Sequence, residues 1–353
     1  LIIGGVIGVI AIIAIVLFVF VFNQPGGQTP SSPGPTSALP TRPAATKAPT
    51  PTRTSSPEAV QIQPTIPAVV TYPSGEGQIA FASDRAGLPQ IYLLDTLDGS
   101  IKPLISNVDG ACQPAWSPDG QRLAFISPCT EKADIYKNTS IYIATFADDS
   151  LSNPQVRLVE TVPGGDFNPT WSADGQQLAF TSLREGQKNV PFIFVRDLTA
   201  NTSSRMPGSA RYDRHPSLAP DGNIYVVEAQ NANGVYFVNV RDPKEKAANP
   251  NAGERYLNNV SQSLMPDVSP DGQYVYFVET PAERWLARQG LTTGLPERLI
   301  DGQGFIYDPD VSPDNGFVVY EMGGDLYKLD VTTRAVSPLT SGSAQDFQPS
   351  WRP

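Results

Sequence analysis

The stretch Pro-Ala-Trp-Ser-Pro-Asp-Gly, residues 114–120, recurs along most of the chain. Further copies are PTWSADG (169–175), PSLAPDG (216–222), PDVSPDG (266–272) and PDVSPDN (309–315), and a partial copy, PSWRP (349–353), ends the chain. The motif aspartates lie 55, 47, 50 and 43 residues apart. Repeats of about this length are typical of propellers and solenoids.

The second half of the motif has the chemistry of a tight hairpin. Pro118 presets a φ suited to a turn, Asp119 can accept hydrogen bonds from turn amides, and Gly120 can adopt a positive φ without steric cost. In the last complete copy the glycine is replaced by Asn315, a residue that tolerates the same conformation. We therefore expect the motif aspartates to form turns rather than to act in catalysis or metal binding.

Three apolar runs separate successive motifs. An alternating run such as LAFIS or VYFVE follows each motif, an aromatic-rich run such as QIYLLD (90–95) or DLYKLD (325–330) comes next, and a weaker run precedes the following motif. Alternation of this kind predicts half-buried strands. With the inner strand of the motif itself, each repeat supplies four antiparallel strands, which is one propeller blade.

The count predicts an all-β, six-bladed β-propeller. Its first blade begins near Gly77 with GQIAFAS, which has no inner strand before it, whereas DFQPSW (346–351) is an inner strand without a blade. We expect the C-terminal strand to complete the first blade and to close the ring, with Trp351 packed between the first and last blades.

These residues carry a family resemblance. The signature PxWSPDG, followed by xLAFxS and IYxxD, resembles the PD40-type, WD40-like repeat of bacterial TolB-like β-propellers, which are related in pattern to the propellers of prolyl oligopeptidases. The resemblance covers about residues 77–353. It weakens where Trp116 and Trp171 give way to Leu218, Val268 and Val311, although these residues are also apolar. It implies a propeller that takes up partner segments at a channel mouth.

The N-terminal part has a different composition. Residues 1–22 carry no charge and have the length of a transmembrane helix, and they exceed the apolar core of a signal peptide. Residues 23–74 are rich in Pro, Thr and Ser and predict a disordered stalk. We assign residues 75–353 to the propeller. Because the sequence begins at Leu1 without basic residues before the span, we expect a further segment upstream.

This organisation predicts a single-pass protein of the cell membrane with its propeller on the extracytoplasmic side. The chain has a formal net charge of −10, which disfavours nucleic acid as a partner. We expect a monomeric propeller that serves as a non-catalytic binding, scaffold or sensor domain. Its expected partner is a protein, a peptide or a component of the cell envelope.

Two other functions stay open. One is a hydrolase acting on peptides or glycans, and the other is the outer sensor part of a transmembrane Ser/Thr kinase. The chain has one histidine, His215, and no GxSxG nucleophile motif, so we expect no catalytic residues. The sequence predicts neither a cofactor nor a metal site. The two cysteines, Cys112 and Cys129, lie near the same end of one strand pair and form either a disulfide or two free thiols.

The candidate binding site is the channel mouth. The residue before each motif proline begins the innermost part of a strand, so we expect a ring of Gln113, Asn168, His215, Met265, Asp308 and Gln348. By period-two alternation, the residues two positions earlier lie on the same face; they are Ala111, Asp166, Asp213, Ser263, Ile306 and Asp346. Such a mouth would favour a cationic ligand, unless its polar groups only solvate a water-filled channel.

Overall fold

The computed structural model describes residues 73–353 apart from 186–189, 224, 231–232, 243, 245–247, 250–254, 257–261, 281–284 and 301–303. The chain divides into two units, Leu1–Gln63 and Pro64–Pro353, and every described residue belongs to the second. The predicted span, 1–22, and all but the last two residues of the predicted stalk, 23–74, lie outside the described residues. In the described part of the chain, no helix is long and apolar enough to cross a membrane.

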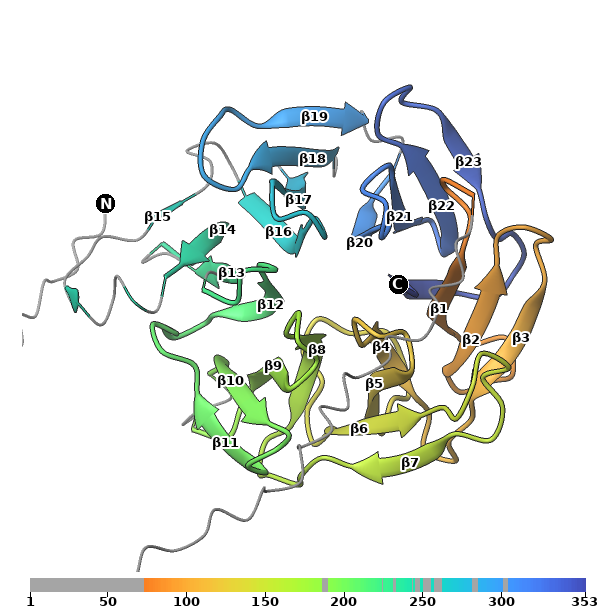
Figure 1. Cartoon of the computed structure of the whole chain (residues 1–353), viewed down its shortest axis with the longest axis horizontal. Helices are drawn as coiled ribbons and strands as arrows, with labels where there is room; N and C mark the ends of the chain where they lie inside the picture. Colours follow the sequence, from red (N-terminus) through yellow and green to blue (C-terminus); the bar gives the residue numbers. More distant parts are fainter. Residues whose placement is uncertain are drawn as a thin grey trace, which may run out of the picture. The chain divides into compact units, whose positions relative to one another are not determined.

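The second unit is a six-bladed propeller of four-stranded antiparallel sheets (Figure 1). Blade one contains β1 (Gln78–Ser83), β2 (Gln90–Asp95), β3 (Ile101–Ile105) and β24 (Asp346–Trp351). Blade two contains β4 (Cys112–Trp116), β5 (Arg122–Ser127), β6 (Ser140–Thr145) and β7 (Gln155–Leu158). Blade three contains β8 (Asp166–Trp171), β9 (Gln177–Ser182), β10 (Phe192–Asp197) and β11 (Thr202–Arg205).

The other three blades repeat this order. Blade four contains β12 (Arg214–Leu218), β13 (Tyr225–Gln230), β14 (Tyr236–Arg241) and β15 (Arg255–Tyr256). Blade five contains β16 (Gln262–Val268), β17 (Tyr274–Thr280), β18 (Trp285–Gly290) and β19 (Glu297–Ile300). Blade six contains β20 (Ile306–Val311), β21 (Phe317–Met322), β22 (Asp325–Asp330) and β23 (Val336–Pro338). The predicted blade count and strand order are therefore confirmed.

The motif forms the predicted hairpin between the first and second strands of a blade. In blade two the Ser117 hydroxyl donates to Asp119 Oδ1 at 2.5 Å and accepts from the Arg122 N–H at 2.9 Å. Asp119 Oδ1 also accepts from the Gln121 N–H at 3.0 Å. Gly120 has a φ of 63° and Asn315, its counterpart in blade six, a φ of 62°. The motif aspartate therefore accepts a hydrogen bond in the turn, as predicted, and the serine hydroxyl, for which no role was predicted, supplies further hydrogen bonds.

The C-terminal strand closes the ring. β24 pairs with β1 in an antiparallel register in which Trp351 lies opposite Ile79. The Trp351 side chain is 4% exposed and belongs to one apolar cluster with residues of blades one and six, including Ile79, Phe81, Val319 and Leu326. Both the closure and the position of Trp351 agree with the sequence prediction.

The two cysteines form a disulfide. Cys112 lies on β4 and Cys129 follows β5, and their Cα atoms are 5.9 Å apart. Cys112 pairs next to this end of the ladder, opposite Ile126, and the Cys129 N–H donates to the Asp109 carbonyl at 2.9 Å. A bridge over a loop of this length stabilises a fold by about 3 kcal/mol in the chain-entropy model.

We expect Trp351→Ala to lower the free energy of unfolding by about 3–5 kcal/mol, because it opens a cavity between blades one and six. Urea unfolding followed by fluorescence and circular dichroism measures the loss. Val336→Ala, which truncates an exposed side chain on β23, is the matched control and should change stability by less than about 0.5 kcal/mol. Equal losses in the two variants would contradict the closure role of Trp351.

Candidate binding site at the channel mouth

The six residues that precede the motif prolines line one cavity of about 510 Å³, at the end of the ring where the motif hairpins lie. They share a left-handed backbone conformation, with φ values of 53° (Gln113), 51° (Asn168), 49° (His215), 52° (Met265), 46° (Asp308) and 54° (Gln348). The ladder register of each inner strand shifts at this point, which marks a β-bulge. The predicted ring of residues is therefore present at the mouth.

Side chains of this ring bind the backbone of the next blade. The Gln113 N–H donates to Gln348 Oε1 at 3.1 Å, and the Asn168 N–H donates to Gln113 Oε1 at 2.6 Å. Between blades five and six, the Asp308 N–H lies 3.4 Å from Met265 Sδ, a weaker acceptor. These contacts satisfy backbone donors that the bulges leave without a ladder partner. Several side chains that we expected to face a ligand therefore also hold neighbouring blades together.

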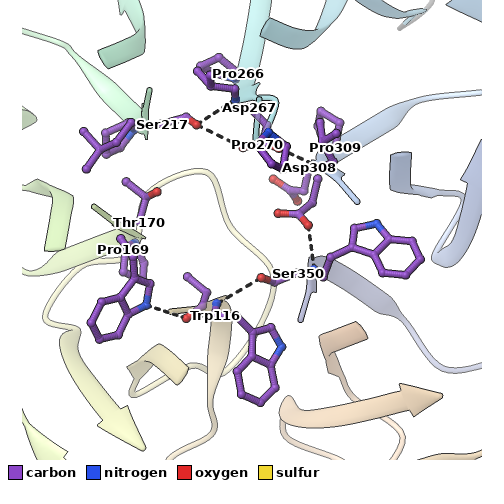
Figure 2. A pocket seen from close by; sticks show the side chains of 18 of the residues that line it. Trp116, Pro169, Thr170, Ser217, Pro266, Asp267, Pro270, Asp308, Pro309 and Ser350 are labelled. Atoms are coloured by element: carbon purple, nitrogen blue, oxygen red, sulfur yellow. Dashed lines mark hydrogen bonds between the residues drawn. The ribbon is translucent and has the colours of Figure 1, made fainter. Parts of the chain in front are cut away.

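A second ring, one position beyond the prolines, was not predicted. Figure 2 shows Ser217, Asp267 and Ser350 arranged around the mouth. Each accepts a hydrogen bond from the N–H of the residue at the tryptophan position of the next blade, and Asp310 does the same. The bonds are Val268 to Ser217 (3.0 Å), Val311 to Asp267 (2.9 Å), Trp351 to Asp310 (2.7 Å) and Trp116 to Ser350 (3.3 Å).

Two members of the second ring are carboxyls on adjacent blades. Burial raises the pKa of Asp267 to about 6, against the hydrogen bonds from Val311 and Ser217. Burial, followed by the charge of Asp267, raises the pKa of Asp310 well above its usual value. Both residues line the mouth and are partly exposed, so solvent reaches them through the cavity. The charge on each of the two carboxyls therefore affects proton binding by the other.

His215 is neutral at the mouth. Burial and the neighbouring Arg214 guanidinium lower its pKa to about 3. Arg214 is itself paired with the buried carboxylate of Glu228. The imidazole consequently carries no charge at physiological pH. Charge at the mouth therefore comes from carboxyls and not from His215.

The residues predicted two positions before the first ring do not line the cavity; they are Ala111, Asp166, Asp213, Ser263, Ile306 and Asp346. Asp166, Asp213 and Asp346 are at most 2% exposed. Each forms an ion pair inside the propeller, with Arg184 (2.7 Å), Arg241 (2.8 Å) and Arg85 (2.7 Å), respectively. The bulge lies between these positions and the prolines, so the period-two alternation on which we placed them does not hold across it. Each of these aspartates is therefore paired with an arginine of the same chain and not with a ligand.

The rest of the lining is apolar and rigid. Every inner strand contributes its motif proline, namely Pro114, Pro169, Pro216, Pro266, Pro309 and Pro349. Trp116, Trp171 and Trp351 also contribute, and the Trp171 Nε1–H donates to the Ala115 carbonyl at 2.9 Å. Because these rings have few accessible conformations, ordering them on binding costs little entropy.

The fold and the mouth define a class: closed β-propellers in which every inner strand places a proline at the same end of the central channel. Residues 102–250 match the family model described as "TolB beta propeller domain". The chain is 30% identical over 161 residues, 45% of its length, to a TolB homologue of Chlorobium luteolum, covering 33% of that protein. It is 37% identical over 78 residues, 22% of its length, to the Tol-Pal system protein TolB of Bordetella pertussis, covering 16% of that protein. The domain is a TolB-like β-propeller.

Other comparisons agree on the fold. The propeller superposes on the crystal structure of TolB from Acinetobacter baumannii with a TM-score of 0.63 and 21% identity, over 78% of this chain and 67% of the other. An uncharacterized peptidase of Bacillus subtilis is 33% identical over 98 residues, 28% of this chain and 13% of the peptidase. The chain thus spans a third or less of the length of these three curated relatives.

We expect Asp310→Asn to raise the free energy of unfolding at pH 8 and to leave it unchanged near pH 4. A carboxyl whose folded pKa is raised contributes stability below its unfolded pKa of 3.8 and loses that contribution as pH rises through the folded pKa. The gain at pH 8 should be about 1.4 kcal/mol for each unit by which the fold raises the pKa. Urea unfolding at a series of pH values measures it.

The control for this experiment is Asp174→Asn. A hydrogen bond from the Ser172 hydroxyl lowers the pKa of Asp174, so this variant should be less stable than the wild type by a nearly constant amount above about pH 5, and this deficit should shrink only as pH falls below 3.8. Between about pH 5 and pH 8, only Asp310→Asn should show a stability difference from the wild type that changes with pH. A difference for Asp310→Asn that does not change with pH would show that the fold does not raise the Asp310 pKa.

Proposed function

We propose that this TolB-like propeller is a binding domain that takes up a cationic segment of another protein at the channel mouth. The main support is the carboxyl pair of Asp267 and Asp310. A sheltered pair of like charges destabilises a fold, and such arrangements are typically found at functional sites. A ligand ammonium or guanidinium group at the mouth would offset the repulsion and would restore both carboxylates.

The shape of the mouth supports a protein segment as the ligand. Its volume of about 510 Å³ is within the usual range of ligand sites and exceeds what a single metal ion needs. Prolines from all six blades and tryptophans from blades one, two and three give it apolar walls, and Asp267, Asp308 and Asp310 give it its carboxyls. Apolar walls with a few placed polar groups suit a side chain that has both an aliphatic stem and a charged end, such as lysine or arginine.

The family and the disulfide support the proposed setting. The relative from Bordetella pertussis is named as a protein of the Tol-Pal system. We propose that this chain also binds a protein partner. Disulfides such as Cys112–Cys129 persist in oxidising compartments, which suits a propeller outside the cytoplasm. With the apolar run 1–22 and the Pro-rich run 23–74 before it, the propeller would be held on a stalk at the outer side of the membrane.

Selection of a random peptide library on the propeller tests the proposal. We expect the selected peptides to contain lysine, arginine or a free terminal amine. Their affinity should fall at least about tenfold in Asp267→Asn/Asp310→Asn, because the ligand's charge then loses the paired carboxyls and Asp308 is the remaining carboxyl among the lining residues. Calorimetry with the selected peptides gives the affinities.

The control variant is Asp98→Asn/Asp148→Asn, which removes two exposed carboxylates that do not line the mouth. It removes the same number of carboxyl groups and should bind the peptides as the wild type does. Unchanged binding to Asp267→Asn/Asp310→Asn, or an equal loss in both double variants, would contradict a role for the pair.

A further inference from the structure

The connection between β5 and β6, residues 128–139, lies at the opposite end of the ring from the mouth. Strands alternate in direction, so the β4–β5 hairpin belongs to one end and the next connection to the other. The Cys112–Cys129 disulfide ties the start of this loop to the inner strand of its blade. Tyr136, 5% exposed, accepts hydrogen bonds at 3.0 Å from the Ala133 N–H and from Gln348 Nε2 of blade one. The loop is therefore held in a defined position.

From this loop, Lys132 extends to blade six. Its ammonium pairs with the Glu321 carboxylate on β21, and its Nζ lies 3.7 Å from the centre of the Tyr307 ring on β20. The Glu321 side chain is 6% exposed and that of Lys132 is 28% exposed. A carboxylate beside an aromatic face is a strong arrangement for binding an ammonium group.

The cavity around this contact is large and acidic. It has a volume of about 870 Å³ and lies between the loop and blade six. Three aromatic rings line it (Phe305, Tyr307 and Tyr327), together with three carboxyls (Asp134, Glu321 and Asp325), whereas Lys132 is its single cation among the described residues. The Lys132 side chain thus occupies part of a site that has more negative charge than it neutralises.

Asp325 adds to this imbalance. Its Oδ1 is buried and has no hydrogen-bond donor among the described residues. Burial and the nearby charge of Asp346 raise its pKa. A cation bound in the cavity would be attracted by three carboxyls, whereas an anion would be repelled by them and attracted by one ammonium. The charges therefore favour a positively charged ligand.

We propose that this second cavity is a binding site for a primary alkylammonium group, such as a lysine side chain of a partner protein, and that Lys132 occupies it as an internal ligand. The external ammonium takes the place of Lys132 between Glu321 and the Tyr307 ring, and its alkyl stem lies along the aromatic wall. The cavity shares no lining residue with the channel mouth, so the inference is independent of the function proposed for the mouth.

Because Lys132 would compete with an external ammonium group, removing it should raise the affinity for the probe. The probe is Nα-acetyl-lysine methylamide, titrated into the propeller by calorimetry and by NMR. If Lys132 fills the site about nine-tenths of the time, Lys132→Ala should bind the probe about tenfold more tightly than the wild type. A site that used Lys132 to hold an anion would instead give Lys132→Ala no gain for this probe.

Matched variants identify the site. Lys137→Ala removes an equal charge from the same loop at an exposed residue that does not line the cavity, and it should leave the probe affinity unchanged. Adding Tyr307→Leu or Glu321→Gln to Lys132→Ala should abolish the gain. The probe should also raise the melting temperature of Lys132→Ala more than that of the wild type, which reports binding even if one double variant does not fold.

Three results would overturn the inference. They are an affinity of Lys132→Ala no greater than that of the wild type, an equal gain in Lys137→Ala, and equal binding of the uncharged analogue Nα-acetyl-norleucine methylamide. The last result would mean that only the aromatic wall contributes.

Discussion

The structure depends on a left-handed residue followed by a proline in each inner strand. The left-handed φ creates a bulge, and the proline removes one backbone donor that would otherwise remain unpaired. The N–H of the left-handed residue then points away from its own ladder, and in blades two and three a glutamine of the preceding blade accepts it. The feature that shapes the mouth is thus also the feature that joins the blades.

Most of the fold could be predicted from local chemistry. The serine, aspartate and glycine of the motif specify a turn on their own, and Trp351 could be placed because the first blade lacked an inner strand. Side-chain direction could not be predicted across the bulge, since a φ of about 50° at a non-glycine residue leaves no clear signal in a sequence. Asp166, which we expected at the mouth, is for this reason buried against Arg184.

The second ring left a signal that period-two reasoning did not use. After the motif proline, blades two to six have Ala115, Thr170, Ser217, Asp267 and Asp310, and β24 has Ser350. A serine there accepts the interblade N–H at no electrostatic cost, as Ser217 and Ser350 show. Asp267 and Asp310, at the equivalent positions of adjacent blades, accept the same kind of interblade hydrogen bond although their charges repel each other. Their presence therefore calls for a reason other than blade packing.

The two ends of the ring differ in how they can acquire specificity. At the mouth every blade contributes the same proline-containing segment, so the walls are fixed and chemistry changes only where a blade departs from the repeat, as at Asp267 and Asp310. The other end is formed by connections that differ in length and sequence, which is where binding residues usually vary. At that end, Lys132 on the loop tied by the disulfide contacts the Glu321 carboxylate and the Tyr307 side chain of blade six. Since the repeat builds the scaffold, recognition at either end depends on the residues that depart from it.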